Sequence, residues 1–144
     1  LEFWSMGKVI VEAKIENLDD LYRADRTEIP AAQVRTVTVA DALVDTAASG
    51  LGMPKRFVAQ LGLQFVRSRQ ARTSAGLANF AVYRAVRLTV QGRDCICDVA
   101  ELPDECPILI GQIPLEALDF IVDPRGQKLA GNPDHGGEQM LDMF

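Results

Sequence analysis

The feature that most constrains the fold is a short unit that occurs twice along the chain. In the first copy, the apolar pair Leu43-Val44 precedes small residues and a helix-like segment that begins at Pro54. In the second copy, the apolar run Ile108-Leu109-Ile110 precedes Gly111 and a helix-like segment opened by Pro114. Proline suits the first turn of a helix, and glycine permits a sharp turn before it. A repeated strand, tight turn, helix and strand predicts two related halves around a pseudo-two-fold axis in one small β domain.

Alternating apolar residues predict the strands that surround these two units. Val9, Val11, Ala13 and Ile15 share one face of a strand. The same reasoning predicts strands at 35–39, 63–66, 80–90, 95–100 and 120–122, with turns at 91–94 and 123–126. Residues 17–32 indicate a long loop or a short helix, and residues 132–144 show no strong ordering signal. We therefore expect an all-β domain with two short helices.

Charge and length limit the possible partners. The net charge is -5, from 20 acidic and 15 basic residues, and the acidic residues form no single run. Nucleic acids and anionic membranes bind clustered Lys and Arg, so neither is an expected partner. The small basic group Arg67, Arg69 and Arg72 is interleaved with Ser and Ala, which favours a solvated loop. Nearly half of the residues are apolar, so one domain can form a core, and an oligomer interface would add to it.

The cysteines and the first residues indicate where the chain functions. Cys95, Cys97 and Cys106 are odd in number and closely spaced, which favours reduced thiols in the cytoplasm over disulfides. No signal peptide or membrane-length apolar run is visible. Residues 1–5 precede Met6-Gly7 and are typical of a cloning remnant. We expect one domain at 6–130 and a C-terminal tail at 131–144.

Other chemistries find weaker support in the sequence. A serine hydrolase is disfavoured because His135, the one histidine, lies in a Pro/Gly-rich tail and no G-x-S-x-G turn occurs. A cysteine peptidase is disfavoured for the same reason, and Cys95 and Cys97 are expected to pack as small apolar residues of a strand. A metal site made of the three cysteines and His135 has suitable atoms but poor spacing.

The residues on either side of Asp45 resemble the active site of a known family. The stretch Ala42–Ser49 reads Ala-Leu-Val-Asp-Thr-Ala-Ala-Ser, and it resembles the active-site stretch of retropepsin-like aspartic proteases. The run Ile108–Gly111 resembles the second signature of that family, two apolar residues and glycine before a helix. The resemblance covers roughly residues 34–129. It implies an acid-protease fold, a closed six- or seven-strand barrel or sandwich.

The resemblance also implies the roles of individual residues. Asp45 would be the catalytic carboxylate, Thr46 would link the two active-site loops across a dimer axis, and Ala47 occupies the glycine position of the family. Residues 67–79 would form the flap that closes over the substrate. The residues expected to contact substrate are Ala48, Leu51, Met53, Ser74, Ala75, Gly76, Ile110 and Ile113.

The chemistry requires two carboxylates, and the sequence contains one Asp-Thr signature. We therefore expect a homodimer in which each subunit contributes Asp45, with a polypeptide substrate bound as an extended strand. No metal or other cofactor is expected. Alanine at position 47 leaves two hypotheses open, an active aspartic endopeptidase or a catalytically weak or silent peptide-binding or dimerisation module on the same fold.

Overall fold

A ring of β-strands forms the body of the protein. The computed structural model describes residues 8–123 and 125–142, so the predicted cloning remnant at residues 1–5 lies outside the described residues. The ring runs in the order β1 (Val9–Asn17), β2 (Thr36–Val44), β7 (Leu109–Ile110), β3 (Leu51–Pro54), β6 (Arg93–Leu102) and β5 (Gly76–Val90). Pairing of β1 with β5 closes the ring, and β4 (Gln64–Thr73) is a seventh strand that pairs with β5. The expected closed all-β architecture is confirmed.

The core lies inside this ring and follows the period of two that strands impose. In β1 the side chains of Val9, Val11, Ala13 and Ile15 are buried, and the residues between them point outward. Apolar residues from every strand of the ring join one cluster with residues of α3 and α4, the helices described below. Burial of this surface is the main favourable contribution to the fold.

The described residues form three short α-helices, one more than predicted, and two of them, α3 and α4, pack against the core of the ring. Helix α3 (Lys55–Leu61) ends at Gly62, which adopts the left-handed conformation with φ 63°. This confirms the helix predicted after Pro54, and glycine is the residue that most readily adopts such a cap. Helix α4 (Gln112–Leu118) is the predicted second helix, and it buries Pro114, Leu115 and Leu118. None of the helices in the described part of the chain is long and apolar enough to cross a membrane.

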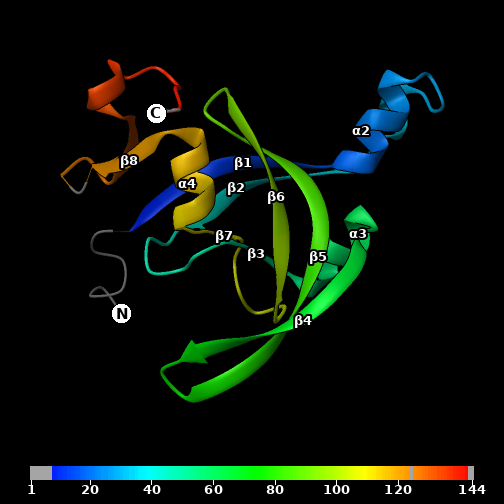
Figure 1. The fold of residues 1–144 in the computed structure, drawn as a ribbon, viewed down its shortest axis with the longest axis horizontal. Coiled ribbons are helices and arrows are strands. Elements are labelled where there is room, and N and C mark those ends of the chain that lie inside the picture. The colour runs from blue at the N-terminus through cyan, green and yellow to red at the C-terminus, as the bar shows by residue number, and fades with distance from the viewer. Residues whose placement is uncertain (1–7, 124, 143–144) are drawn as a thin grey trace.

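The additional helix is α2 (Leu18–Asp25), which resolves the open choice between loop and helix for residues 17–32. The Asn17 side chain accepts a hydrogen bond from the Asp20 backbone at 3.0 Å and caps the helix. Asp20 is buried and bonds the Arg35 guanidinium at 2.8 and 3.0 Å. This ion pair joins α2 to the residues before β2, beside the short 3-10 helix Ala31–Gln33. In Figure 1, α2 lies at one end of the body.

Several strands differ from the sequence prediction. Strand β2 is continuous through both predicted segments, and β3 was not predicted because it is short and contains glycine and proline. Residues 67–79 belong to a regular β4–β5 hairpin instead of the solvated loop predicted around Arg67, Arg69 and Arg72, and Figure 1 shows the hairpin extending away from the body. Strand β8 (Phe120–Asp123) pairs with an unpredicted strand, β9 (Lys128–Gly131). The expected domain end at residue 130 therefore falls inside a strand.

Several hydrogen bonds, centred on His135 and Asp119, bind the C-terminal segment to the body. His135, in the 3-10 helix Pro133–His135, places Nδ1 2.6 Å from Asp119 Oδ2 and Nε2 3.1 Å from Asp142 Oδ2. The Met140 backbone donates to the same Asp119 oxygen at 3.0 Å. Arg93 donates to the carbonyls of Asp119 and Gly137, so a fixed cation also faces this cluster. These contacts order a segment in which the sequence alone shows no ordering signal.

We expect the stability of the protein to depend on the protonation of His135. The hydrogen bond to Asp119, and then that to Asp142, raises the pKa of His135. A raised pKa means that the stabilisation is complete below about pH 6.5, the ordinary histidine value, and is lost as pH rises through the folded value. Thermal unfolding of wild type and His135→Gln between about pH 5 and pH 9 should show this loss in wild type only. Identical pH profiles would contradict the prediction, and Asp142→Asn should have a smaller effect because Asp142 is exposed.

Candidate active site

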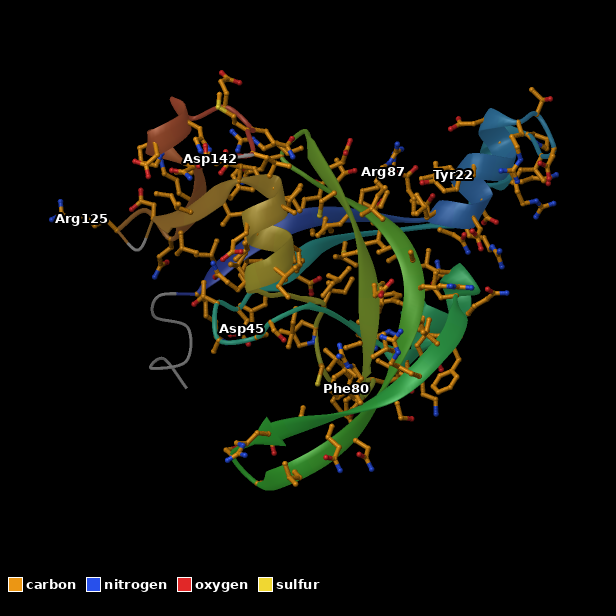
Figure 2. All side chains as sticks on the ribbon, viewed as in Figure 1. Tyr22, Asp45, Phe80, Arg87, Arg125 and Asp142 are labelled. Atoms are coloured by element: carbon orange, nitrogen blue, oxygen red, sulfur yellow. The ribbon has the colours of Figure 1, made fainter. Side chains whose placement is uncertain are left out.

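Asp45 directly follows β2 and begins the loop to β3. Its backbone N–H donates to the Ile110 carbonyl at 2.9 Å, so the ladder between β2 and β7 continues to this residue. Its carboxylate Oδ1 accepts a hydrogen bond from the Ala47 backbone at 3.0 Å. The side chain is half-buried, and Figure 2 shows Asp45 on the loop with the β4–β5 hairpin below it in that view. Asp45 is thus held in position while one carboxylate oxygen makes no hydrogen bond to the loop.

Backbone hydrogen bonds hold the loop that carries Asp45 against the end of β7 and the start of α4. Strand β7 lies between β2 and β3, parallel to β2 and antiparallel to β3, so the Asp45 loop must pass over its end. The Gly50 carbonyl accepts from the Gly111 N–H at 2.9 Å, and the Ala48 and Ser49 carbonyls accept from Gln112 and Ile113 at 2.8 Å each. These are donors that the first turn of α4 would otherwise leave unsatisfied. The two repeated units therefore meet at this loop.

Glycine at position 111 is required by this close approach. A Cβ atom there would lie 2.4 Å from the Gly50 carbonyl oxygen and 2.7 Å from that of Ala48. Both are backbone atoms, which cannot move aside as the end of a side chain can. The glycine of the second sequence signature is thus explained by packing against the first.

The face of the sheet on which Asp45 lies follows from strand alternation. Val44 is buried in the core, so Leu43 and Asp45 on either side of it point outward. Leu43 is the register partner of Leu109, and Leu109 is the partner of Gly52. Register partners point to the same face of a sheet. The half-buried side chains of Leu43 and Leu109 therefore lie on the same face as Asp45, and Leu102 covers the buried Gly52 on that face. The sequence alone did not identify these residues.

This geometry corrects part of the predicted substrate-binding set. Leu51, Met53 and Ile110 are 1%, 0% and 0% exposed and belong to the core. The prediction selected the wrong face of β3 and β7, because apolar residues occupy both faces of strands this short. Gly52 and Leu109, their immediate neighbours, have the orientation of Asp45. Counting alternate residues back from Asp45 could have identified Leu43, but strand pairing was needed for the other two.

The remaining predicted site residues lie on the surface. Thr46 and Ala47 are exposed, Ala48 is half-buried, and Ile113 is 62% exposed at the start of α4. Ser74 and Ala75 form the turn of the β4–β5 hairpin, and Gly76 begins β5 with φ 113°. The structure therefore separates the set into one group around Asp45 and another at the hairpin tip. Their contacts with a substrate stay predictions.

The comparisons with known proteins agree with this arrangement. The sequence model of one family, described as aspartyl protease, matches residues 30–113, which is more than half of the chain. The chain belongs to the aspartyl protease family. A comparison with curated proteins finds no match. The matched region contains Asp45, the β4–β5 hairpin and the second signature, and it ends in the first turn of α4. The predicted resemblance is therefore confirmed, and the general function of the chain is that of an aspartic protease.

Ala47 is accommodated in the active-site loop of this aspartyl protease without backbone strain. Among the described non-glycine residues, Ala47 is not one of those that have a positive φ. A left-handed conformation would have favoured glycine, so its absence removes a backbone objection to alanine here. The bulk of the methyl group beside Asp45, the predicted catalytic carboxylate, concerns only a bound substrate.

Glycine at position 47 is expected to lower stability slightly. The substitution Ala47→Gly increases the freedom of the unfolded chain and relieves no strain, so we expect a loss of about 0.4–1 kcal/mol in unfolding free energy. Denaturant unfolding measures this loss. An increase in stability would show that the alanine is strained. In a peptidase assay, a gain in rate above about tenfold, or 1.4 kcal/mol, would show that the methyl group obstructs the substrate.

The other nucleophiles of the chain lie in unsuitable surroundings. Cys95 and Cys97 are half-buried on β6 and pack against the core as predicted. The hydrogen bond that the Cys97 thiol donates to Cys95, followed by burial, raises the pKa of Cys97. Both His135 nitrogens face carboxylates, and the described residues contain no group of three or more His, Cys, Asp or Glu arranged to hold a metal. The metal site made of His135 and the cysteines is therefore not formed.

Proposed function

We propose that two copies of this chain form a homodimeric aspartic endopeptidase, in which the two Asp45 carboxylates act as one catalytic pair. The observation that carries the proposal is the Asp45 loop, which backbone hydrogen bonds hold across β7 and which leaves the carboxylate partly exposed. The chain has a single Asp-Thr signature, so a second carboxylate of the same kind requires a second subunit. A two-fold axis beside the loop supplies it, because such an axis brings identical residues together.

The chemistry follows from two carboxylates held close together. They cannot both ionise easily at short range, so they share one proton and titrate as a pair. The ionised carboxylate accepts a proton from the attacking water, and the protonated one polarises the carbonyl of the scissile peptide bond. The new carbon–oxygen bond forms as the carbon–nitrogen bond breaks, and the leaving amine takes up the proton. No further cofactor is needed for this sequence.

The surface beside Asp45 suits an extended polypeptide. Leu43 and Leu109 contribute apolar side chains to this face, and Leu102 lies over the buried Gly52 between β3 and β6. An extended substrate presents alternate side chains to such a surface and offers its backbone for hydrogen bonds. The hairpin tip at residues 74–76 would close over it from the other side.

Cleavage of a peptide library by the purified wild-type protein tests the proposal. We expect cleavage at acidic pH, inhibition by a pepstatin-type compound and a specific activity that falls on dilution, because the monomer lacks a complete site. Sedimentation at the same concentrations should show the dimer dissociating in parallel. A strictly monomeric protein that cleaves peptides, or a dimer that binds peptides without cleaving them, would contradict the proposal. The second result would support the silent-module alternative, which the exposed Ala47 methyl group beside Asp45 favours.

A further inference from the structure

Positive charge is concentrated in one stretch of this acidic chain. No Asp or Glu occurs from Thr46 to Arg93, whereas eight Lys or Arg residues do, although the net charge of the chain is -5. Four of them are exposed on the β4–β5 hairpin, namely Arg67, Arg69, Arg72 and Arg84. Within the described residues, none of these four forms an ion pair. The hairpin is therefore a cationic element on an otherwise acidic domain.

Strand register places two of these arginines on the face of the sheet that carries Asp45. The face of the sheet on which Asp45 lies continues from the buried Gly52 to its partner Ala100 on β6, and from Ala100 to the buried Val82 on β5. Val82 is the partner of Arg67 on β4. Arg69 lies two residues further along β4, opposite Phe80, and so points to the same face.

Arg72 provides an internal contrast. Its register partner is Leu77, which lies three residues from Phe80 and five from Val82 along β5. Residues an odd number of positions apart on a strand point to opposite faces. The Arg72 side chain therefore points to the opposite face of the hairpin from that of Arg69. The two arginines share the same strand and the same exposure, and they differ in the face that they occupy.

From this arrangement we infer that the substrates are polypeptides with Asp or Glu near the scissile bond, bound by Arg67 and Arg69. The inference rests on the proposed peptidase function and adds a substrate class to it. Guanidinium groups form paired hydrogen bonds with carboxylates. The acidic remainder of the chain disfavours binding of an anionic peptide elsewhere, so the hairpin face is the surface on which it is attracted.

Matched peptides test the inference. A sequence that wild type cleaves is made with Glu or Gln on both sides of the scissile bond, and kcat/KM is compared above about pH 5, where Glu is ionised. We expect a preference of about threefold to tenfold for the Glu peptide, decreasing in high salt and below about pH 4. Arg69→Gln should reduce the preference and Arg72→Gln should not. Arg67→Glu with Arg69→Glu should shift the preference to a Lys peptide.

Binding separates failure of this inference from failure of the proposed function. The same fluorescent peptides can be titrated against Asp45→Asn protein, which requires no catalysis. If the Glu peptide binds preferentially but wild type cleaves no peptide, the preference for acidic peptides is supported as a property of a silent module. The proposed peptidase function is then contradicted. Three results would overturn the inference and leave the proposed peptidase function unaffected. They are cleavage with no preference for the Glu peptide, equal effects of Arg69→Gln and Arg72→Gln, and Arg69-dependent binding of an oligonucleotide in place of peptides.

Discussion

Replacing Asp45 with asparagine is expected to lower the rate of peptide cleavage by at least about a thousandfold, because an amide cannot take a proton from water. The fold should be retained. The Asp45 side chain accepts one hydrogen bond, from the Ala47 backbone at 3.0 Å, and the amide oxygen of asparagine can accept it as well. We therefore expect the unfolding free energy to change by less than about 1 kcal/mol. Activity assays and denaturant unfolding on the same preparation measure both effects.

A matched control and a mixing experiment sharpen this prediction. Asp41 is an exposed carboxylate on the same strand, and Asp41→Asn should leave the rate within about twofold of wild type. Adding a ninefold excess of Asp45→Asn protein to wild type should leave about a tenth of the wild-type subunits in fully wild-type dimers, with activity reduced accordingly. Unchanged activity after exchange of subunits would mean that each subunit acts alone. Equal activities of wild type and Asp45→Asn would support the silent module.

Replacing Gly111 with alanine is expected to have the largest effect on the fold. The added Cβ would lie 2.4 Å from the Gly50 carbonyl oxygen, against a hydrogen bond of 2.9 Å between the same two residues. The loop and the first turn of α4 would have to separate, which breaks several backbone hydrogen bonds. We expect a loss of about 2–4 kcal/mol in unfolding free energy. Denaturant unfolding provides the measurement, and cleavage should fall with it because the Asp45 loop loses its support.

Gly50 provides the control for this substitution. A Cβ atom at Gly50 has nothing within 4 Å, and its φ is not in the left-handed region. Gly50→Ala should therefore leave stability unchanged or raise it slightly, by about 0.4–1 kcal/mol. If both alanine variants were equally stable, the contact between the two repeated units would not be the element that holds the Asp45 loop.

These two predictions address separate requirements of the site. Asp45 supplies the proton chemistry, whereas Gly111 allows the backbone to hold that carboxylate at a defined place. Correct placement of reacting groups contributes a large part of catalysis, so a displaced loop should lower the rate even where the carboxylate is intact. The predicted difference is that Asp45→Asn removes activity from a stable protein, and Gly111→Ala removes stability first.

The sequence by itself determined the class of fold and the location of the site. Alternation in β1, the glycine that ends α3 and the repeated unit depend on neighbouring residues, and local patterns of this kind are readable without a structure. Asp45 was identified because its flanking residues and the run at residues 108–111 form two signatures at a suitable separation. Helix α2 stayed an open choice, since its Asn17 cap and its Asp20–Arg35 ion pair combine local and distant contacts.

Only the tertiary structure decided which side chains share a surface with Asp45. Leu51 and Gly52 are neighbours in sequence, yet the Leu51 side chain faces the core and Gly52 lies on the opposite face beneath Leu102, and pairing with β7 determines which. The same pairing across the ring places Arg67 and Arg69 on the face of Asp45 and Arg72 on the other. Strand register depends on hydrogen bonds between segments far apart in the chain, and a shift of one residue reverses every side chain. Local composition cannot specify that choice.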